Sequence, residues 1–320
     1  MEHVPMQPIK GIHHITAIAS EPQRNLDFYH GLLGQRFVKR TVNFDDPTTY
    51  HFYFGDEVGS PATILTFFPW RGLKRGRVGN GEVAAVGYRI PPSALDYWQE
   101  RLHAHNISTH LETRFGQQVL CFEDPDGMAL ELVTDDSPSK VRHWVDSPIP
   151  EACAIQGFHG ATIWVFDHTP SARLLTEIMG YTLVGQEGNR RRYRAAGEVG
   201  AYIDLVEKDG LGLGQAGAGS VHHIAFRTQS DEEQAEYRQA LLQVGLHVTP
   251  VRDRQYFRSI YFREPNGVLY EIATDAPGFL VDEPLETLGH ELKLPPWLEP
   301  QRAMISAQLP PITIPDAPSE

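Results

Sequence analysis

Residues 114–133 read RFGQQVLCFEDPDGMALELV, and residues 254–273 read RQYFRSIYFREPNGVLYEIA. The two stretches align without a gap at an offset of 140 residues, so that Glu131 and Glu271 fall at matching places. A second set of matches lies near the start of each copy, at an offset of 146 residues: Gly11-Ile12-His13 with Gly157-Phe158-His159, and Leu33-Gly34 with Met179-Gly180. Two sets of matches in the same order indicate an internal duplication.

Each copy divides again into two units, in which a strand and a helix are followed by about three strands. In the first unit the β-branched stretch Ile12–Ala19 predicts a strand, and apolar residues at helical spacing over Pro22–Leu33 predict a helix. The tetrapeptides Asp124-Pro125-Asp126-Gly127 and Glu264-Pro265-Asn266-Gly267 predict tight hairpin turns, because Pro fixes φ and Gly accepts a positive φ. The sequence therefore predicts four such units.

Four units of this kind predict an α+β fold in which mixed sheets curl around cavities. We expect two domains, at residues 1–135 and 157–275, joined by a linker at 136–156 that is rich in Asp, Ser and Pro. Residues 276–320 form a Pro-rich C-terminal extension, which we expect to be extended or disordered.

Composition limits the classes of function. The chain has 320 residues, and 28 basic against 41 acidic side chains give a net charge of −13, which argues against a general nucleic-acid binder. Its apolar runs are too short to cross a membrane. Two cysteines, Cys121 and Cys153, form neither a disulfide framework nor a C-x-x-C site. We therefore expect a soluble, cytoplasmic protein that binds neither nucleic acid nor membrane.

Two histidine dipeptides begin predicted strands, His13-His14 in the first unit and His222-His223 in the fourth, and Glu271 lies on the last strand. Neighbouring strand residues point to opposite faces, so one histidine of each pair should face the cavity, and strand phase does not decide which. Two imidazoles and one carboxylate are the facial triad that holds Fe(II) and leaves positions open. A lone histidine is usually a core or surface residue, but two paired dipeptides favour a metal site.

The duplication tests this interpretation. If the copies are related by a pseudo-two-fold axis, a second triad should come from the matching places, which are Gly160 for His14, Ala85 for His223 and Glu131 for Glu271. Only the glutamate is kept there. One site could therefore hold a metal ion and the other could not, which is the pattern expected when a duplicated fold keeps one active centre.

Three motifs carry a family resemblance: GIHHIT at 11–16, LGQRFVKRT at 33–41 and GVLYE at 267–271. With them the chain, over about residues 11 to 295, resembles the ring-cleaving dioxygenases of the vicinal oxygen chelate superfamily (the glyoxalase and bleomycin-resistance superfamily). It is similar in particular to the hydroquinone-type branch, which includes the chlorohydroquinone 1,2-dioxygenases. The resemblance implies four βαβββ modules in two vicinal-oxygen-chelate domains, an Fe(II) or sometimes Mn(II) centre, and O2-dependent, extradiol-type opening of an aromatic diol.

The resemblance also implies roles for individual residues. The metal ligands fall on His14, His223 and Glu271, and the surrounding catalytic positions fall on His13, Thr16, His222, Arg254 and Tyr261. We expect His13 or His222 to act as a base, and Tyr261 to hydrogen-bond a bound phenolate. Arg254 would stabilise negative charge or orient a ring oxygen, although a structural role in its hairpin competes with this interpretation.

Two other functions on the same scaffold stay open. A glyoxalase-like isomerase would use Ni(II) or Zn(II), usually with more carboxylate ligands, and a ligand-sequestering protein would need no triad. The sequence therefore favours an Fe(II)-dependent dioxygenase that acts on a hydroquinone-like diol and O2. Exposed sheet edges and the apolar segment Leu292–Ile305 further predict a homodimer or larger assembly. We interpret the basic run Arg190–Arg192 as a solvated surface.

Overall fold

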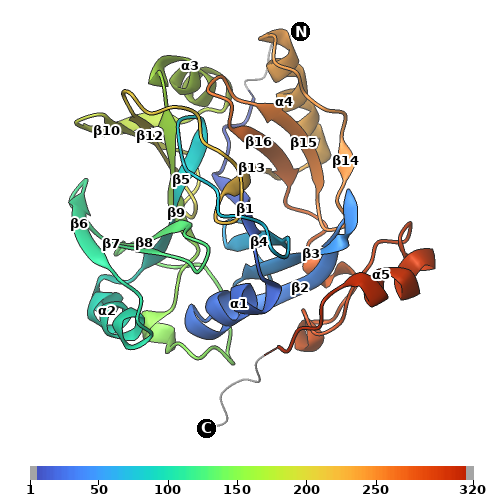
Figure 1. The fold of residues 1–320 in the computed structure, drawn as a ribbon. Coiled ribbons are helices and arrows are strands. Elements are labelled where there is room, and N and C mark those ends of the chain that lie inside the picture. The colour runs from blue at the N-terminus through green and yellow to red at the C-terminus, as the bar shows by residue number, and fades with distance from the viewer. Residues whose placement is uncertain (1–5, 315–320) are drawn as a thin grey trace.

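The computed structural model describes residues 6–314. These residues form two curled eight-stranded sheets with few helices, and the two sheets lie beside one another (Figure 1). This architecture confirms the predicted α+β fold with mixed, curled sheets. Within residues 6–314, no helix has both the length and the apolar character that a membrane crossing requires.

The first sheet has the strand order β14-β15-β16-β13-β1-β4-β3-β2. Its strands are β1 (Ile12–Ala19), β2 (Arg36–Asn43), β3 (Asp46–Gly55), β4 (Ile64–Pro69), β13 (Val221–Thr228), β14 (Arg252–Asp253), β15 (Arg258–Arg263) and β16 (Leu269–Thr274). The second sheet has the order β10-β11-β12-β9-β5-β8-β7-β6. Its strands are β5 (Glu82–Ile90), β6 (His110–Arg114), β7 (Gln117–Glu123), β8 (Ala129–Thr134), β9 (Phe158–Val165), β10 (Thr182–Glu187), β11 (Arg190–Arg194) and β12 (Tyr202–Glu207).

One helix follows the first strand of each unit. The helices are α1 (Pro22–Leu26), which continues as a π-helical turn over Asp27–Leu32, α2 (Leu95–Ala104), α3 (His168–Arg173), which continues as a π-helical turn over Leu174–Ile178, α4 (Asp231–Gln243) and, in the C-terminal extension, α5 (Arg302–Gln308). Strand, helix and three strands thus recur four times, as the sequence predicts.

The sheets do not follow the two sequence copies. The first sheet joins the first unit to the fourth through antiparallel pairing of β1 with β13, and the second joins the second unit to the third through β5 and β9. Each sheet therefore takes one unit from each copy. This exchange places His14 on β1 beside His223 on β13, although 209 residues separate them in sequence.

The predicted hairpin turns are confirmed. Gly127 has φ of 84° and Gly267 has φ of 105°, which glycine adopts without the strain that a side chain would meet. In the first turn, Asp124 Oδ1 accepts hydrogen bonds from the backbone N–H groups of Asp126 and Met128. The turn is therefore held by its own first residue.

The C-terminal extension differs from the prediction. Residues 276–314 are packed against the first sheet, with Leu294, Leu298 and Ile305 buried in the main core. Lys39 on β2 is fully buried and pairs with Asp282 and Glu283 of the extension at 2.7 and 2.8 Å. Apolar anchors and a buried ion pair hold the extension in place, so the expectation of an extended or disordered tail is wrong for these residues, while 315–320 lie outside the described residues.

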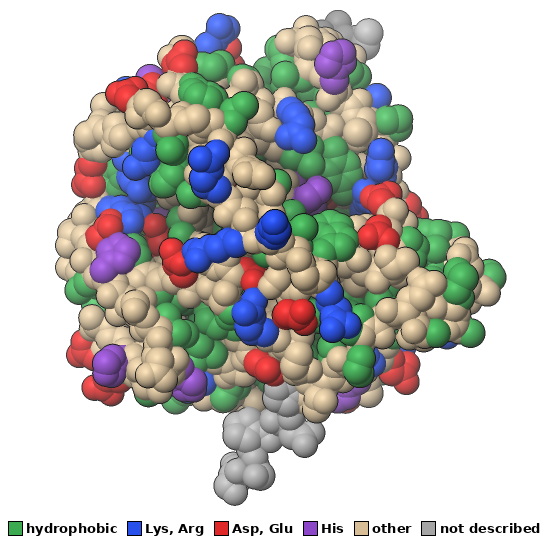
Figure 2. All heavy atoms as spheres, in the orientation of Figure 1, with side chains coloured by type: hydrophobic (Ala, Val, Ile, Leu, Met, Phe, Trp, Pro, Cys, Tyr) green, Lys and Arg blue, Asp and Glu red, His purple; other side chains and the backbone are tan. Residues whose placement is uncertain are grey.

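Charged side chains of both signs are mixed on one face of the molecule. On the face drawn in Figure 2, acidic and basic side chains are interspersed over both sheets, and neither sign covers the surface. Nor is the run Arg190–Arg192 the solvated surface that we expected. Arg192 is buried and binds Asp204 through two hydrogen bonds, because β11 turns this side chain into the second sheet.

Candidate active site

The side chains of His14, His223 and Glu271 converge in a pocket of the first sheet. Glu271 Oε2 lies 2.9 Å from His223 Nε2 and 3.5 Å from His14 Nε2, and the two nitrogens are 3.4 Å apart. All three side chains are buried. They meet because β1, β13 and β16 are neighbouring strands in register.

This arrangement fits a divalent metal ion. Donor atoms that lie about 2.1 Å from one ion at right angles to one another are about 3.0 Å apart, close to the separations found here. Within the part of the chain that the structure describes, Glu271 Oε2 has no hydrogen-bond partner of suitable geometry, whereas Glu271 Oε1 accepts a hydrogen bond from Ser259 Oγ. A buried carboxylate oxygen that is left unsatisfied is costly, so an ion is the partner that this site lacks.

Each proposed ligand histidine is paired with its sequence neighbour. His14 Nδ1 lies 2.9 Å from His13 Nδ1, and His223 Nδ1 lies 2.7 Å from His222 Nδ1. A ligand histidine that gives its Nε2 lone pair to a metal carries its hydrogen on Nδ1. We therefore assign His13 and His222 as acceptors at Nδ1, with their own hydrogens on Nε2.

The charge states also suit a metal. Burial opposes ionisation of Glu271, but the electrostatic influence of His14 and His223 beside it outweighs burial and holds its pKa well below the usual value. Burial lowers the pKa of His223 and, with the charge of His223, lowers the pKa of His222 to about 4. At neutral pH the carboxylate is ionised and these two imidazoles are neutral, which are the forms that bind divalent metals.

The two flanking histidines occupy different environments. His222 lines the pocket, with its ring partly buried there and the rest of the residue open to solvent. His13 is buried and lines a separate cavity, and its Nε2 has no hydrogen-bond partner of suitable geometry among the described residues. Of the two expected bases, only His222 therefore has access to a molecule in the pocket.

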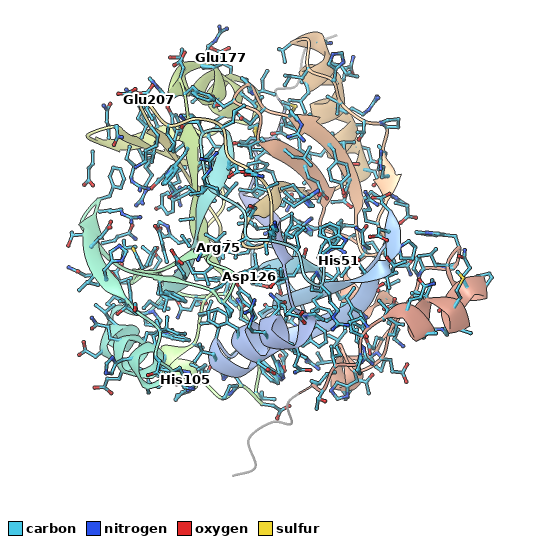
Figure 3. All side chains as sticks on the ribbon, viewed as in Figure 1. His51, Arg75, His105, Asp126, Glu177 and Glu207 are labelled. Carbon is cyan, nitrogen blue, oxygen red and sulfur yellow. The ribbon has the colours of Figure 1, made fainter. Side chains whose placement is uncertain are left out.

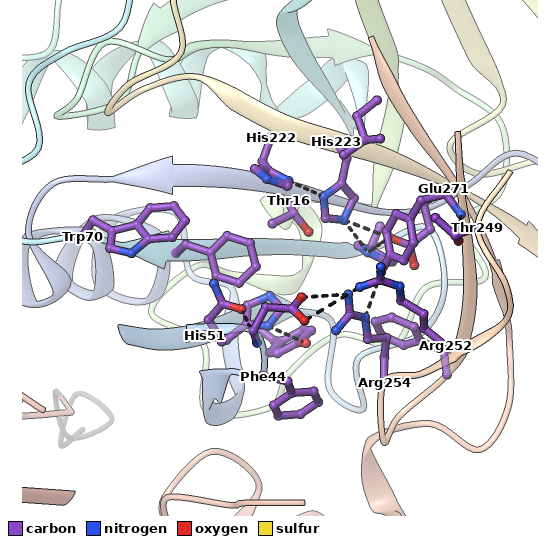
Figure 4. Close-up of a pocket in the computed structure, with 18 residues that line it drawn as sticks. Thr16, Phe44, His51, Trp70, His222, His223, Thr249, Arg252, Arg254 and Glu271 are labelled. Carbon is purple, nitrogen blue, oxygen red and sulfur yellow. Dashed lines mark hydrogen bonds and ion pairs between the residues drawn. The ribbon is translucent and has the colours of Figure 1, made fainter. Parts of the chain in front are cut away.

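The pocket has a volume of about 290 Å³. Aromatic side chains form much of its lining: Phe44, Tyr53, Phe68, Trp70, Phe257 and Tyr261 (Figure 4). A cavity of about 150 Å³ accommodates benzene. The pocket therefore has room for a substituted aromatic ring beside the three candidate ligands.

Arg254 and Tyr261 form one unit at the edge of the pocket. Arg254 Nε donates to Tyr261 Oη at 3.1 Å, and Arg254 Nη2 donates to Asp45 Oδ2 at 3.0 Å. Burial opposes the charge of Arg254, but Tyr261 and Asp45 outweigh it and raise the pKa of Arg254. Burial raises the pKa of Tyr261, so its phenol stays protonated. With its oxygen accepting from Arg254, the Tyr261 hydroxyl keeps its own hydrogen to donate.

The structure brings three further residues to the site that we did not predict. Ser259 bonds Glu271, and its counterpart in the other copy is Val119, a difference that could have revealed it. His51 and Tyr53 alternate on β3 and both line the pocket. Alternation shows that these two share a face, but only the sheet order shows that this face is opposite the predicted ligands.

The second sheet repeats the register without the chemistry. The pair His14↔Ala225 in the first sheet corresponds to Gly160↔Gly87 in the second. In the same way, Thr16↔His223 corresponds to Thr162↔Ala85, and Ala225↔Glu271 corresponds to Gly87↔Glu131. These pairs confirm the predicted equivalences. Arg114 Nη1 lies 2.6 Å from Glu131 Oε1, so a guanidinium neutralises the remaining glutamate in place of a metal.

Two other groups of possible ligands are present among residues 6–314. They are His110, Glu112 and Cys121, and Asp167, His168 and Glu207. Each contains an exposed residue, and Glu207 lies in the second sheet, apart from His51 of the first (Figure 3). The group at His14 is fully buried, which makes it the strongest candidate.

Curled sheets of exchanged βαβββ units around one group of two histidines and a carboxylate define a protein of the vicinal-oxygen-chelate class. The family described as the Glyoxalase/Bleomycin resistance protein/Dioxygenase superfamily matches residues 11–132 and 157–272. The chain belongs to this superfamily.

Relatives are similar over nearly the whole chain. The Bacillus subtilis protein named "Putative ring-cleaving dioxygenase MhqO" is 48% identical over 304 residues, which are 95% of this chain and 97% of the relative. The "Chlorohydroquinone/hydroquinone 1,2-dioxygenase" of Sphingobium indicum is 37% identical over 304 residues, 91% of this chain and 93% of the relative. A crystal structure titled as a "putative dioxygenase" from Bacillus subtilis has a TM-score of 0.94 and 47% identity, and covers 97% of this chain and 99% of its own.

Proposed function

We propose that the protein is a non-haem Fe(II)-dependent dioxygenase that cleaves the ring of a hydroquinone-like diol and inserts both atoms of O2. The buried group of His14, His223 and Glu271 in an aromatic-lined pocket carries this proposal. The name of the Sphingobium indicum relative supports the substrate class. Mn(II) is the alternative metal. We also propose that the chain acts in the cytoplasm as a homo-oligomer.

We propose that the protein resembles extradiol dioxygenases in its set of metal ligands, and we extend the comparison no further than the ligands. Two imidazoles and one carboxylate on one face of the ion are the donor set of that type. The Sphingobium indicum relative is named for 1,2-cleavage of hydroquinone and not for extradiol cleavage. A hydroquinone carries its hydroxyls on opposite carbons, so only one of them can reach the metal.

His14, His223 and Glu271 would hold the ion through Nε2, Nε2 and Oε2. When bound, Fe(II) supplies open positions for a substrate oxygen and O2, so that no further redox cofactor is needed. Phe257 packs against His14 with ring centroids 4.8 Å apart, which fixes that imidazole and keeps water from its face.

Two donors are available to the substrate oxygen. In the tautomer assigned above, His222 presents Nε2–H to the pocket, so we propose that it donates a hydrogen bond rather than acting as the base that we first expected. Tyr261 Oη accepts from Arg254 and donates its own hydrogen. Donors aimed at developing negative charge lower the barrier.

Metal analysis and oxygen uptake test this function. The protein is purified without oxygen, its metal content is measured, and Fe(II)-loaded, Mn(II)-loaded and metal-free samples are given hydroquinone or catechol. We expect one O2 consumed per hydroquinone and a ring-opened product that contains two ¹⁸O atoms when ¹⁸O2 is supplied. Uptake without Fe(II) or Mn(II), or a product with one labelled oxygen, would contradict the proposal.

A further inference from the structure

A continuous chain of hydrogen bonds lies along the pocket wall of the first sheet. Tyr53 Oη lies 2.9 Å from His51 Nδ1, and His51 Nε2 lies 2.8 Å from Thr66 Oγ1. Thr66 Oγ1 is in turn 2.8 Å from Thr16 Oγ1. Tyr53, His51 and Thr16 all line the same pocket as the proposed metal ligands (Figure 4).

Strand register makes this chain rigid. Tyr53 on β3 stands opposite Thr66 on β4, Thr66 stands opposite Thr16 on β1, and Thr16 stands opposite His223 on β13. The four residues thus form one row across the sheet. The His51 ring also packs on Tyr53 and on Phe68, with centroids 4.1 and 4.4 Å apart. The row ends at a proposed metal ligand.

The second sheet replaces this chain by ions. By register, Tyr53, His51, Thr66 and Thr16 correspond to Arg192, Arg190, Asp204 and Thr162. Arg192 and Arg190 both bind Asp204, at 2.8 and 2.9 Å. The neutral chain therefore belongs to the sheet that has the candidate metal site, and the other sheet has a salt-bridge cluster at the corresponding positions.

A neutral imidazole at His51 allows the hydrogen bonds of this chain to be donated in either of two directions. Burial lowers the pKa of His51 well below its usual value, so the ring carries one hydrogen. With that hydrogen on Nε2, Tyr53 donates to Nδ1, and its oxygen accepts from a ligand. With the hydrogen on Nδ1, Tyr53 accepts from His51 and donates to a ligand. Tyr53 can thus pair with a hydroxyl or with an oxygen that lacks a hydrogen.

A para-diol needs a second partner of this kind. Some other polar groups of the pocket are already engaged, since Asp45 and Arg254 pair with each other and Asn43 Oδ1 accepts from Asp45 N. Among residues 6–314, the one hydrogen bond of Tyr53 Oη is to His51. We propose that Tyr53 Oη binds the ring hydroxyl that does not reach the metal, and that His51 is a positioning residue that holds Tyr53 for this contact. The inference rests on the proposed function for its substrate class.

Anaerobic binding tests the role of Tyr53. Dissociation constants of hydroquinone and of 4-methylphenol, which has a methyl group in place of the second hydroxyl, are measured by calorimetry on Fe(II)-loaded protein. Tyr53→Phe should weaken hydroquinone binding about tenfold and leave 4-methylphenol unchanged, because a site built for a hydroxyl discriminates against its loss. Tyr50→Phe is the matched control. Tyr50 is on the same strand as Tyr53 but lies outside the pocket, and its hydroxyl donates to Pro310 O.

A double-mutant cycle tests the role of His51. His51→Phe keeps the ring packing and should weaken hydroquinone binding in the wild type but not in a Tyr53→Phe background. A merely structural role would give equal losses in both, and that result would overturn the positioning role. If His51→Phe fails to fold, His51→Gln goes through the same cycle.

These binding results stand apart from catalysis. Selective loss of hydroquinone affinity in Tyr53→Phe supports the inference even if the wild type consumes no O2, which would refute only the proposed reaction. A wild type that binds hydroquinone no more tightly than 4-methylphenol, or a Tyr53→Phe variant that loses affinity for both alike, would overturn it.

Discussion

At the residue scale, the two equivalent glutamates of the duplicated fold have different neighbours. Glu271 lies beside two imidazoles and leaves one oxygen without a hydrogen bond, whereas Glu131, at the same register, is neutralised by Arg114. Neighbours rather than residue type therefore decide which carboxylate can bind a metal.

Glu271→Ala should abolish oxygen uptake and reduce bound iron to trace levels, because two imidazoles alone hold Fe(II) weakly. Glu131→Ala is the matched control and should keep iron and turnover close to the wild type. His14→Ala and His223→Ala should behave like Glu271→Ala. Iron per chain is measured after anaerobic loading and desalting, and loss of iron in Glu131→Ala with retention in Glu271→Ala would show that the wrong half has been chosen.

Tyr261 tests the preference for para-diols. A catechol is oriented by two metal bonds, whereas a hydroquinone depends on side chains for its geometry. Tyr261→Phe should therefore lower kcat/KM for hydroquinone about ten- to a hundredfold, or about 1.4–2.7 kcal/mol, and should affect catechol less. Tyr270→Phe on the next strand is the control, since its buried hydroxyl has no partner. Equal losses on both diols would place the protein outside the hydroquinone branch.

At the scale of elements, individual strands and turns could be predicted from the sequence, but the pairing of distant strands could not. The strand at Ile12–Ala19 and the Asp124 and Glu264 turns followed from periodicity and from the φ preferences of Pro and Gly. The histidine dipeptides and Glu271 were found through residue chemistry and duplication. His51 and Tyr53 were missed because their meaning depends on which strand lies beside β3, a long-range pairing that no local pattern encodes.

The Asp124 turn gives a stability prediction. Burial raises the pKa of Asp124 from 3.8 to about 6, so the native state holds its proton more tightly than the unfolded chain. This contribution is full below about pH 4 and is lost as pH rises to 6, a change of about 3 kcal/mol in the free energy of unfolding. Asp124→Asn should remove that slope. Urea unfolding at pH 4 to 7 measures it against Asp96→Asn, an exposed control, and parallel curves would contradict it.

At the scale of the whole molecule, the structure offers a surface for assembly that the sequence did not indicate. In the apolar segment Leu292–Ile305 that first suggested an oligomer, Leu294 and Leu298 are buried on their own chain, whereas Trp297 and Met304 are exposed by 47% and 53%. The edge strand β10 also exposes Leu183 and Val184, each by 50%. An exposed apolar edge strand is a surface on which a second chain can pair.

We expect light scattering to give a mass well above 36.0 kDa, the mass of one chain. Leu183→Lys with Val184→Glu should reduce the mass to one chain, because charges on an edge strand prevent pairing. Leu242→Glu, on the exposed side of α4, is the control and should change nothing. A wild-type particle of 36.0 kDa at every concentration would end the idea.

The duplication also limits what the second half can become. Gly160 stands where His14 stands in the first sheet, but a Cβ there would lie 2.1 Å from the backbone oxygen of Tyr202. No rotation of a side chain relieves that contact, because β9 and β12 are hydrogen-bonded at this point. A second metal site therefore requires a different strand spacing as well as two histidines.

Gly160→Ala should accordingly lower the free energy of unfolding by about 1–3 kcal/mol or more, the range of core overpacking. Gly31→Ala is the control, since a Cβ there meets nothing within 4 Å and its φ is ordinary. Gly160→His combined with Ala85→His should bind no second iron. Urea unfolding and iron content measure both effects. The prediction is wrong if the two alanine variants are equally stable, or if the double histidine variant binds two irons per chain. Either result would show that residue identity alone, and not strand spacing, explains why the second sheet has no metal site.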